Sequence, residues 1–237
     1  MQTATTGPEV AIARKVFLAS VIVTVVLYAV PYGQYVAYPL LLLSTLVHEL
    51  GHGVSAVLMG GTFHEFKMWA DGSGVAVHAG RYGAIQDAVI SAGGLVGPAI
   101  GAAIGMACAR RARPARAFLL LIGLGLAVAE ILVVRNLFGL IFVGIVAASC
   151  IGLAVRASAR TAQVAVIFLS VQLALAVFSR SDYLFTDVAQ TSSGKMPSDV
   201  AQMANALVGP YWFWGGVCAL ISVVTLAGGA FALLRER

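Results

Sequence analysis

The residues with the clearest chemical potential are two histidines and a glutamate in the stretch TLVHELGHGV, residues 45–54. His48 and His52 are four positions apart, so on an α-helix their side chains project from nearly the same side, one turn apart. Both imidazoles can then reach one metal ion, and Glu49 can hydrogen-bond a water molecule on that ion. This spacing predicts two zinc ligands and a general base for peptide hydrolysis.

A long apolar segment surrounds these three residues. Placing an ionisable side chain in the middle of a membrane-spanning helix costs about 2.5 kcal/mol or more, so such residues usually serve a function. The alternative is structural: His48 and His52 would form hydrogen bonds between helices, with Glu49 as their partner.

The composition places the chain in a membrane. Of its 237 residues, 60% are hydrophobic and 11% are charged, against about 45–50% and about 25% in soluble globular domains. We therefore expect an integral, multi-pass protein of the plasma membrane, surrounded by the lipid bilayer. The net charge of +5 comes from positive residues in short loops, which reflect membrane topology, so nucleic acid is not an expected partner.

Seven apolar segments are long enough to be membrane spans, each of which needs about 20 residues. They indicate an all-α polytopic membrane protein of six to seven transmembrane helices, with a short β-hairpin-like insertion after the helix that carries His48. The whole chain, 1–237, then forms one membrane-embedded domain with a short tail at 1–14. The expected spans are residues 16–30, 36–59, 88–109, 115–134, 137–155, 161–179 and 211–234.

Two polar insertions interrupt this pattern, at residues 60–87 and 180–210. In the first, alternating apolar and polar residues flank the sequence DGSG, residues 71–74, which predicts a β-hairpin with its turn there. The second contains TSSGKMPSD and predicts a loop that opens a short helix, with Ser198 as its N-cap. With seven spans, both insertions lie on the same face of the membrane as the histidine pair.

The opposite face receives most of the arginines, including the run RRARPAR at residues 110–116. Positive residues in short loops favour the cytoplasm, which would place the N-terminus and the polar cluster outside. Arg14 and Lys15 argue for the reverse orientation, so both orientations stay open.

Glycines recur at four-residue spacing in the segment GGLVGPAIGAAIG, at Gly93, Gly97, Gly101 and Gly105. They form one face of small residues, the pattern by which membrane helices approach closely. We expect this helix to pack on the helix of His48 and to hold the site in place. Generic helix packing is the alternative.

Several short motifs occur in an order that resembles the site-2 protease family, the intramembrane zinc metallopeptidases. They are HELGH within a span, the Gly60-Gly61 boundary, the DGSG insertion, AGGLVGPAIGA, VRNLFG at residues 134–139, PSDVAQMA at residues 197–204, and tryptophans in the last span. The resemblance covers roughly residues 40–225. It is closest to the compact branch that lacks soluble regulatory domains.

The resemblance implies that His48 and His52 are zinc ligands, that Glu49 is the catalytic base and that Zn²⁺ is the cofactor. The family's third ligand is usually an aspartate in an N-x-x-P…DG element on a later span. Asn136 could match that asparagine, but Gly139 stands in place of the proline and the stretch that follows has no carboxylate.

Four acidic residues remain as candidates for the third ligand, because a catalytic zinc site usually has three protein ligands and one open position. Asp187 is favoured, since it follows the sixth span on the expected face. Asp199, Asp182 and Glu130 are the alternatives. Each of the three aspartates could also be a solvated loop residue.

The expected activity is hydrolysis of a peptide bond in or beside a transmembrane segment of another membrane protein or peptide. The hairpin at residues 60–87 would hold the substrate strand by edge pairing. His64 and His78, on either side of its turn, are expected at the surface. The rival interpretations are a catalytically inactive metal-binding or helix-binding protein of the same fold, and a transporter.

Overall fold

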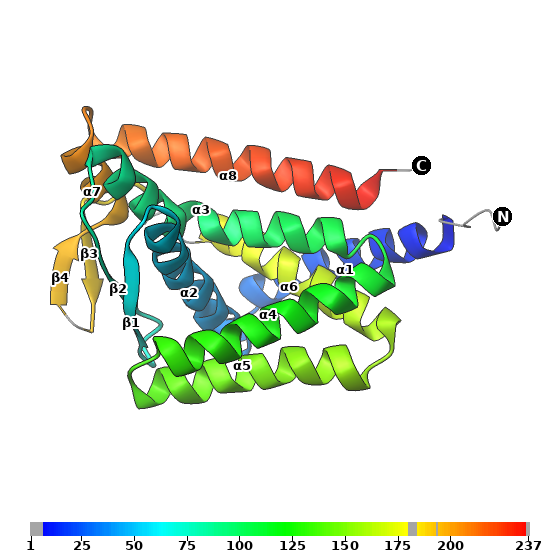
Figure 1. Ribbon diagram of the computed structural model, residues 1–237. Helices are drawn as coiled ribbons and strands as arrows, with labels where there is room; N and C mark the ends of the chain where they lie inside the picture. Colours follow the sequence, from blue (N-terminus) through cyan, green and yellow to red (C-terminus); the bar gives the residue numbers. More distant parts are fainter. Residues whose placement is uncertain (1–6, 180–183, 193, 236–237) are drawn as a thin grey trace.

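The computed structural model describes residues 7–179, 184–192 and 194–235. Within them it contains long helices, one short helix and two β-hairpins (Figure 1). Seven of the helices are long and apolar enough to cross a membrane, which confirms the predicted all-α polytopic fold. The long helices are α1 (Gly7–Ala29), α2 (Gly33–Leu58), α3 (Ala84–Cys108), α4 (Ala112–Leu132), α5 (Leu137–Arg156), α6 (Ala159–Ser179) and α8 (Tyr211–Leu234); α7 (Asp199–Ala206) is the short one.

The first helix is longer than the sequence pattern predicted. It begins at Gly7, so its first residues fall inside the segment 1–14 that was expected to be a tail. Arg14 lies within this helix and donates a hydrogen bond of 3.1 Å to the carbonyl of Leu234 at the end of α8.

Helix α3 is the central element of the bundle, since it packs against α2, α6, α7 and α8. Its residues Ala99 and Ala102 are completely buried. Small side chains let neighbouring helices approach closely, which is how helix bundles in membranes gain packing energy. The helix continues through Pro98.

The hairpin predicted after the second span is present. Strand β1 (Thr62–Met68) pairs antiparallel with β2 (Gly74–Ala79). In the turn, Gly72 has a φ of +85°, a conformation that glycine adopts without steric cost. Asp71 accepts hydrogen bonds from the backbone N–H and the hydroxyl of Ser73, at 2.9 and 2.7 Å, and these bonds close the turn.

The segment between α4 and α5 covers the outer edge of β1. The backbone N–H of Phe66 donates to the carbonyl of Val133 at 2.7 Å, and the carbonyl of Phe66 accepts from the backbone N–H of Arg135 at 3.0 Å. The Asn136 side chain bonds the backbone N–H and carbonyl of Met68, at 3.3 and 2.7 Å. Among the described residues, the hairpin edge that no other strand pairs with is therefore that of β2.

Residues 180–210 contain an element that the sequence analysis did not predict. Strand β3 (Val188–Thr191) pairs antiparallel with β4 (Gly194–Pro197) as a second hairpin. The predicted short helix follows as α7, and the Ser198 hydroxyl caps it by accepting a hydrogen bond from the N–H of Ala201 at 3.2 Å.

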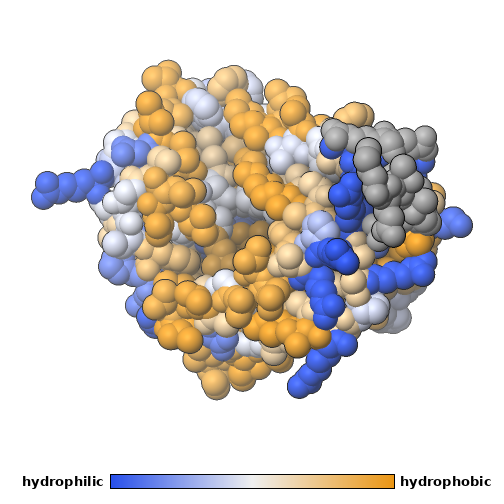
Figure 2. Space-filling view, turned by 45° about the vertical axis from the view of Figure 1, so that its right-hand side comes forward, coloured by the Kyte–Doolittle hydropathy of each residue, from blue (hydrophilic) through white to orange (hydrophobic). Residues whose placement is uncertain are grey.

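Both hairpins lie at one end of the bundle, at the left of Figure 1, and both chain termini lie at the other end. Figure 2, in which the right-hand side of Figure 1 comes forward, shows apolar side chains over much of the bundle and hydrophilic ones at its left edge and toward its right. The loops after the second, fourth and sixth spans therefore share one face, as the span count predicted.

Candidate metal centre

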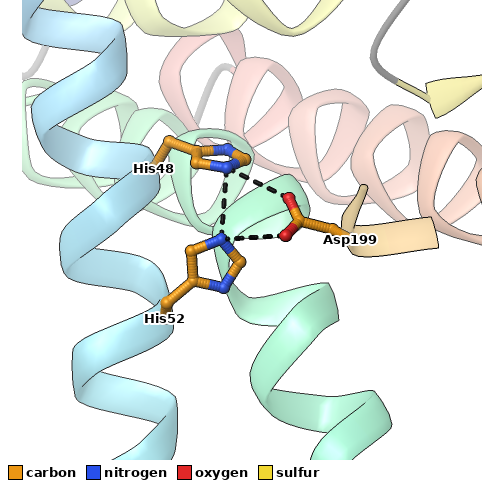
Figure 3. A group of neighbouring side chains, drawn as sticks. All are labelled: His48, His52 and Asp199. Atoms are coloured by element: carbon orange, nitrogen blue, oxygen red, sulfur yellow. Dashed lines mark hydrogen bonds and ion pairs between the residues drawn. The ribbon is translucent and has the colours of Figure 1, made fainter. Parts of the chain in front are cut away.

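Helix α2 carries His48 and His52 in its second half, next to the hairpins. Their Nε2 atoms are 3.2 Å apart, and the two ring planes are nearly perpendicular, at 86°. In Figure 3 both Nε2 atoms point toward the same carboxylate. The helical spacing of the pair thus brings two nitrogen donors into one shared space, as two ligands of a single ion require.

The carboxylate belongs to Asp199, the first residue of α7. Its Oδ2 lies 3.1 Å from Nε2 of His48, and its Oδ1 lies 3.3 Å from Nε2 of His52 (Figure 3). The N-cap residue Ser198 fixes the start of this helix through two hydrogen bonds. Its backbone N–H donates to the carbonyl of Asp187 at 2.9 Å, and its hydroxyl donates to the carbonyl of Thr186 at 2.5 Å.

The orientation of the His52 ring is set from α3. Its Nδ1 lies 2.9 Å from the carbonyl of Ile90, and since a carbonyl only accepts, Nδ1 carries the proton and donates it. Nε2 is then left with its lone pair free for a metal ion. A Cβ atom on Gly94 would lie only 2.2 Å from this Nε2, so the ring occupies space that only a glycine leaves open.

The glycine face of α3 packs on α2 next to the histidines. A Cβ on Gly93 would lie 2.7 Å from the carbonyl oxygen of Gly51, and one on Gly97 would lie 3.4 Å from its Cα. Further along, a Cβ on Gly105 would meet the hydroxyl of Ser170 on α6 at 2.2 Å. The expected contact with the histidine helix is therefore present at Gly93 and Gly97, whereas Gly105 faces α6.

The donor atoms fit a small divalent cation. His48, His52 and Asp199 each offer one ligand atom, and these atoms lie within 4.8 Å of one another. A tetrahedral zinc ion with bonds of about 2.0–2.1 Å separates its ligand atoms by about 3.3 Å, close to the 3.1–3.3 Å observed here. Oδ2 of Asp199 is also buried without a hydrogen-bond partner, so a cation would satisfy it.

The two neighbouring histidines favour an ionised Asp199, although the residue is buried. Glu49, His52 and Asp199 are all buried, with 8–9% of each residue exposed. Burial by itself raises the pKa of the Asp199 carboxyl, but the electrostatic attraction of the two adjacent imidazoles, that of His52 foremost, outweighs burial and holds the pKa well below its usual range. The carboxylate is therefore in the form that binds cations.

Two cavities meet at this cluster. The larger, of about 180 Å³, lies between β2 and the second hairpin, and its walls include the three clustered residues and Glu49. The smaller, of about 60 Å³, lies between α2, α3 and the end of α6. His48, Glu49 and Gly74 line both cavities, so the candidate base can be reached from either side.

The other acidic candidates lie elsewhere or outside the described residues. Asp187, favoured from the sequence, is exposed and precedes β3, and it is not a member of the group that Asp199 completes. Glu130 faces α5, where a Cβ on Gly144 would lie 2.9 Å from its carboxylate. Asp182 lies outside the described residues. The geometry therefore favours Asp199, which the sequence analysis named as an alternative.

Two residues at the site were not identified from the sequence. His78 was expected at the surface, but it is half-buried and lines the larger cavity. Strand alternation could have indicated this, because Gly74, Ala76 and His78 share one face of β2. The contact of Gly94 with His52 was not predicted, because Gly94 is not part of the four-residue glycine spacing.

Comparison with known proteins points to a peptidase family. A family model described as "Peptidase M50B-like" matches residues 18–229, a range that contains all three residues of the cluster. A search of curated proteins and a search of solved structures gave no match.

Proposed function

This chain belongs to the Peptidase M50B-like family, which is related to the site-2 proteases, and from that premise we propose that it is an intramembrane zinc metalloendopeptidase. Its substrate is a transmembrane protein or peptide, cleaved in or beside its membrane-spanning segment. The seven candidate spans suit a multi-pass protein, for which we propose the plasma membrane.

In this proposal His48, His52 and Asp199 hold the zinc ion. Bound zinc would lower the pKa of a coordinated water toward about 7 and polarise the carbonyl of the scissile bond. Glu49 accepts the proton of the attacking water and passes it to the leaving amine nitrogen. The Ile90 carbonyl keeps Nε2 of His52 available by holding the proton on Nδ1.

The observation that carries the proposal is the meeting of Asp199 with a histidine pair from a distant part of the chain. A buried carboxylate within 3.1–3.3 Å of two Nε2 atoms supplies the three protein ligands that a catalytic zinc site needs. The family's usual aspartate element is missing after α4, and Asp199 is a chemically equivalent donor.

The substrate is proposed to bind as an extended strand in the larger cavity. The edge of β2 faces this cavity through Gly74, Val75 and Ala76, whereas the edge of β1 is covered by residues 133–136. An extended substrate segment can pair its backbone with β2, whereas the backbone groups of a helix are already bonded within the helix.

The decisive experiment compares zinc content with proteolysis in the purified chain, reconstituted in lipid vesicles with transmembrane substrates. We expect about one zinc per chain, which His48→Ala removes. Glu49→Gln should keep the zinc and abolish cleavage. A Glu49→Gln variant that cleaves like wild type would refute the role of Glu49. A wild-type chain that binds zinc but cleaves nothing would favour the alternative of an inactive metal-binding protein of the same fold.

A further inference from the structure

The first hairpin contacts one face of α2, along a row of side chains that leads to Glu49. The hydroxyl of Tyr38 donates to the carbonyl of Ala70, and the hydroxyl of Thr45 donates to the carbonyl of Gly72 at 2.7 Å. Glu49 follows Thr45 by one helical turn, so it lies in the same row. The hairpin turn is thereby attached to α2 directly before the candidate base.

Strand β2 comes closest to Glu49 at Gly74. A Cβ atom at this position would lie 2.7 Å from Cγ of Glu49, 2.8 Å from Cγ2 of Thr45 and 3.1 Å from Oε1 of Glu49. Real Cβ atoms do not approach carbon this closely, so any side chain here would displace the strand or the glutamate. The close approach is possible only because residue 74 is a glycine.

The backbone of β2 confines the Glu49 side chain by packing. Ala76 is on the same face of the strand as Gly74 and lines the larger cavity together with Glu49. Glu49 is thus confined at its Cγ by the close approach of Gly74. A glutamate held in this way loses little rotamer freedom when it acts, because the freedom was removed on folding.

We propose that β2 is a positioning element for the catalytic base, with Gly74 confining the Glu49 side chain and Thr45 fixing the strand to α2. This inference rests on the proposed function and deepens it. It gives the first hairpin a second task besides pairing with a substrate strand. The two tasks differ in kinetics: loss of substrate pairing raises KM, whereas displacement of the base lowers kcat.

The central test is Gly74→Ala. We expect kcat to fall about 10²-fold, as for a misplaced catalytic group, while zinc content stays at the wild-type value. Gly125→Ala is the matched control, because nothing lies within 4 Å of a Cβ at that position. Unchanged kcat in Gly74→Ala, or a rise in KM alone, would overturn the proposal.

Thr45 provides two further variants that separate positioning from general damage. Thr45→Ser keeps the hydroxyl that donates to Gly72 but removes Cγ2, one of the two carbons that a Cβ at residue 74 would meet. Added to Gly74→Ala, it should restore part of kcat. Thr45→Val keeps the shape but loses the hydrogen bond, and should lower kcat at wild-type zinc content. Absence of both effects would also overturn the proposal.

A disulfide trap tests the contact without activity. In a chain whose three native cysteines are replaced, Glu49→Cys with Gly74→Cys should oxidise readily in metal-free protein, whereas Glu49→Cys with Val77→Cys should not, because Val77 is on the opposite face of β2. No disulfide in the first pair would overturn the positioning.

The failure of this inference can be told apart from the failure of the proposed function. If the wild-type chain cleaves nothing, the proposed function itself fails. If the wild-type chain cleaves and Gly74→Ala cleaves equally well, only the positioning role of β2 fails.

Discussion

The carboxylate of Asp71, at the turn of the first hairpin, accepts a hydrogen bond of 2.5 Å from the hydroxyl of Ser192, at the turn of the second. The backbone N–H of Ser192 also donates to the hydroxyl of Ser73 at 3.2 Å. The two hairpins form opposite walls of the larger cavity. Their turns are thus joined beside the candidate metal centre, although they come from distant insertions.

We expect this contact between the turns to persist in mildly acidic solution. Hydrogen bonds from Ser192 and then from Ser73 lower the pKa of Asp71. A carboxyl with a lowered pKa in the folded state contributes stability above its unfolded pKa of about 3.9, and this is lost as the pH falls through the folded value. Spin labels at Val77 and Lys195 should therefore report the same distance at pH 7 and pH 5. The distribution should broaden in stronger acid, and in Asp71→Ala at any pH; broadening of the wild type between pH 7 and pH 5 would contradict this.

The proposal that Asp199 is the third ligand predicts opposite results for two aspartates. Asp199→Asn should weaken zinc binding by more than about 100-fold, because removing a ligand costs more than the 10–100-fold typical of supporting residues. Asp187→Asn should bind zinc like wild type, since Asp187 is exposed and outside the cluster. Zinc titration against a competing chelator measures both. Equal zinc loss in the two variants would remove Asp199 from its proposed role.

A side chain at Gly94 should damage the candidate metal centre without replacing any of its proposed ligands. The added Cβ of Gly94→Ala would overlap Nε2 and Cε1 of His52, at 2.2 and 2.3 Å, and would turn the ring away from its position. We expect zinc affinity to fall by about 10–100-fold. Gly101→Ala is the control, because its Cβ would make only ordinary contacts at 3.9 Å. Wild-type zinc affinity in Gly94→Ala would contradict this prediction, because it would show that the His52 ring can move without loss of zinc binding.

Removal of the Asn136 side chain should loosen the first hairpin from the rest of the bundle. Asn136 makes two hydrogen bonds to the backbone of Met68, each worth about 1 kcal/mol net. Asn136→Ala should therefore lower the free energy of unfolding by about 2 kcal/mol. Denaturant titration in mixed micelles measures this, with the exposed Asn205→Ala as control. Equal stability of the two variants would contradict a structural role for Asn136.

Much of this protein follows from short stretches of sequence. The spans, the turn at Asp71–Gly72 and the pairing of His48 with His52 depend on residues within a few positions of one another. Hydrophobic length, turn chemistry and helical periodicity act at that range, so each could be inferred locally. The same applies to Ser198, whose preference for N-cap positions is a property of the residue itself.

Which carboxylate lies beside His48 and His52 was decided only by tertiary structure. Asp187 and Asp199 are in the same insertion and on the same face, and no local pattern separates them. The unpredicted pairing of β3 with β4, and the packing of α7 on α3 and α8, bring Asp199 to the histidines and leave Asp187 exposed. Such packing sums many weak contacts between distant segments, and these contacts do not exist until the chain has folded.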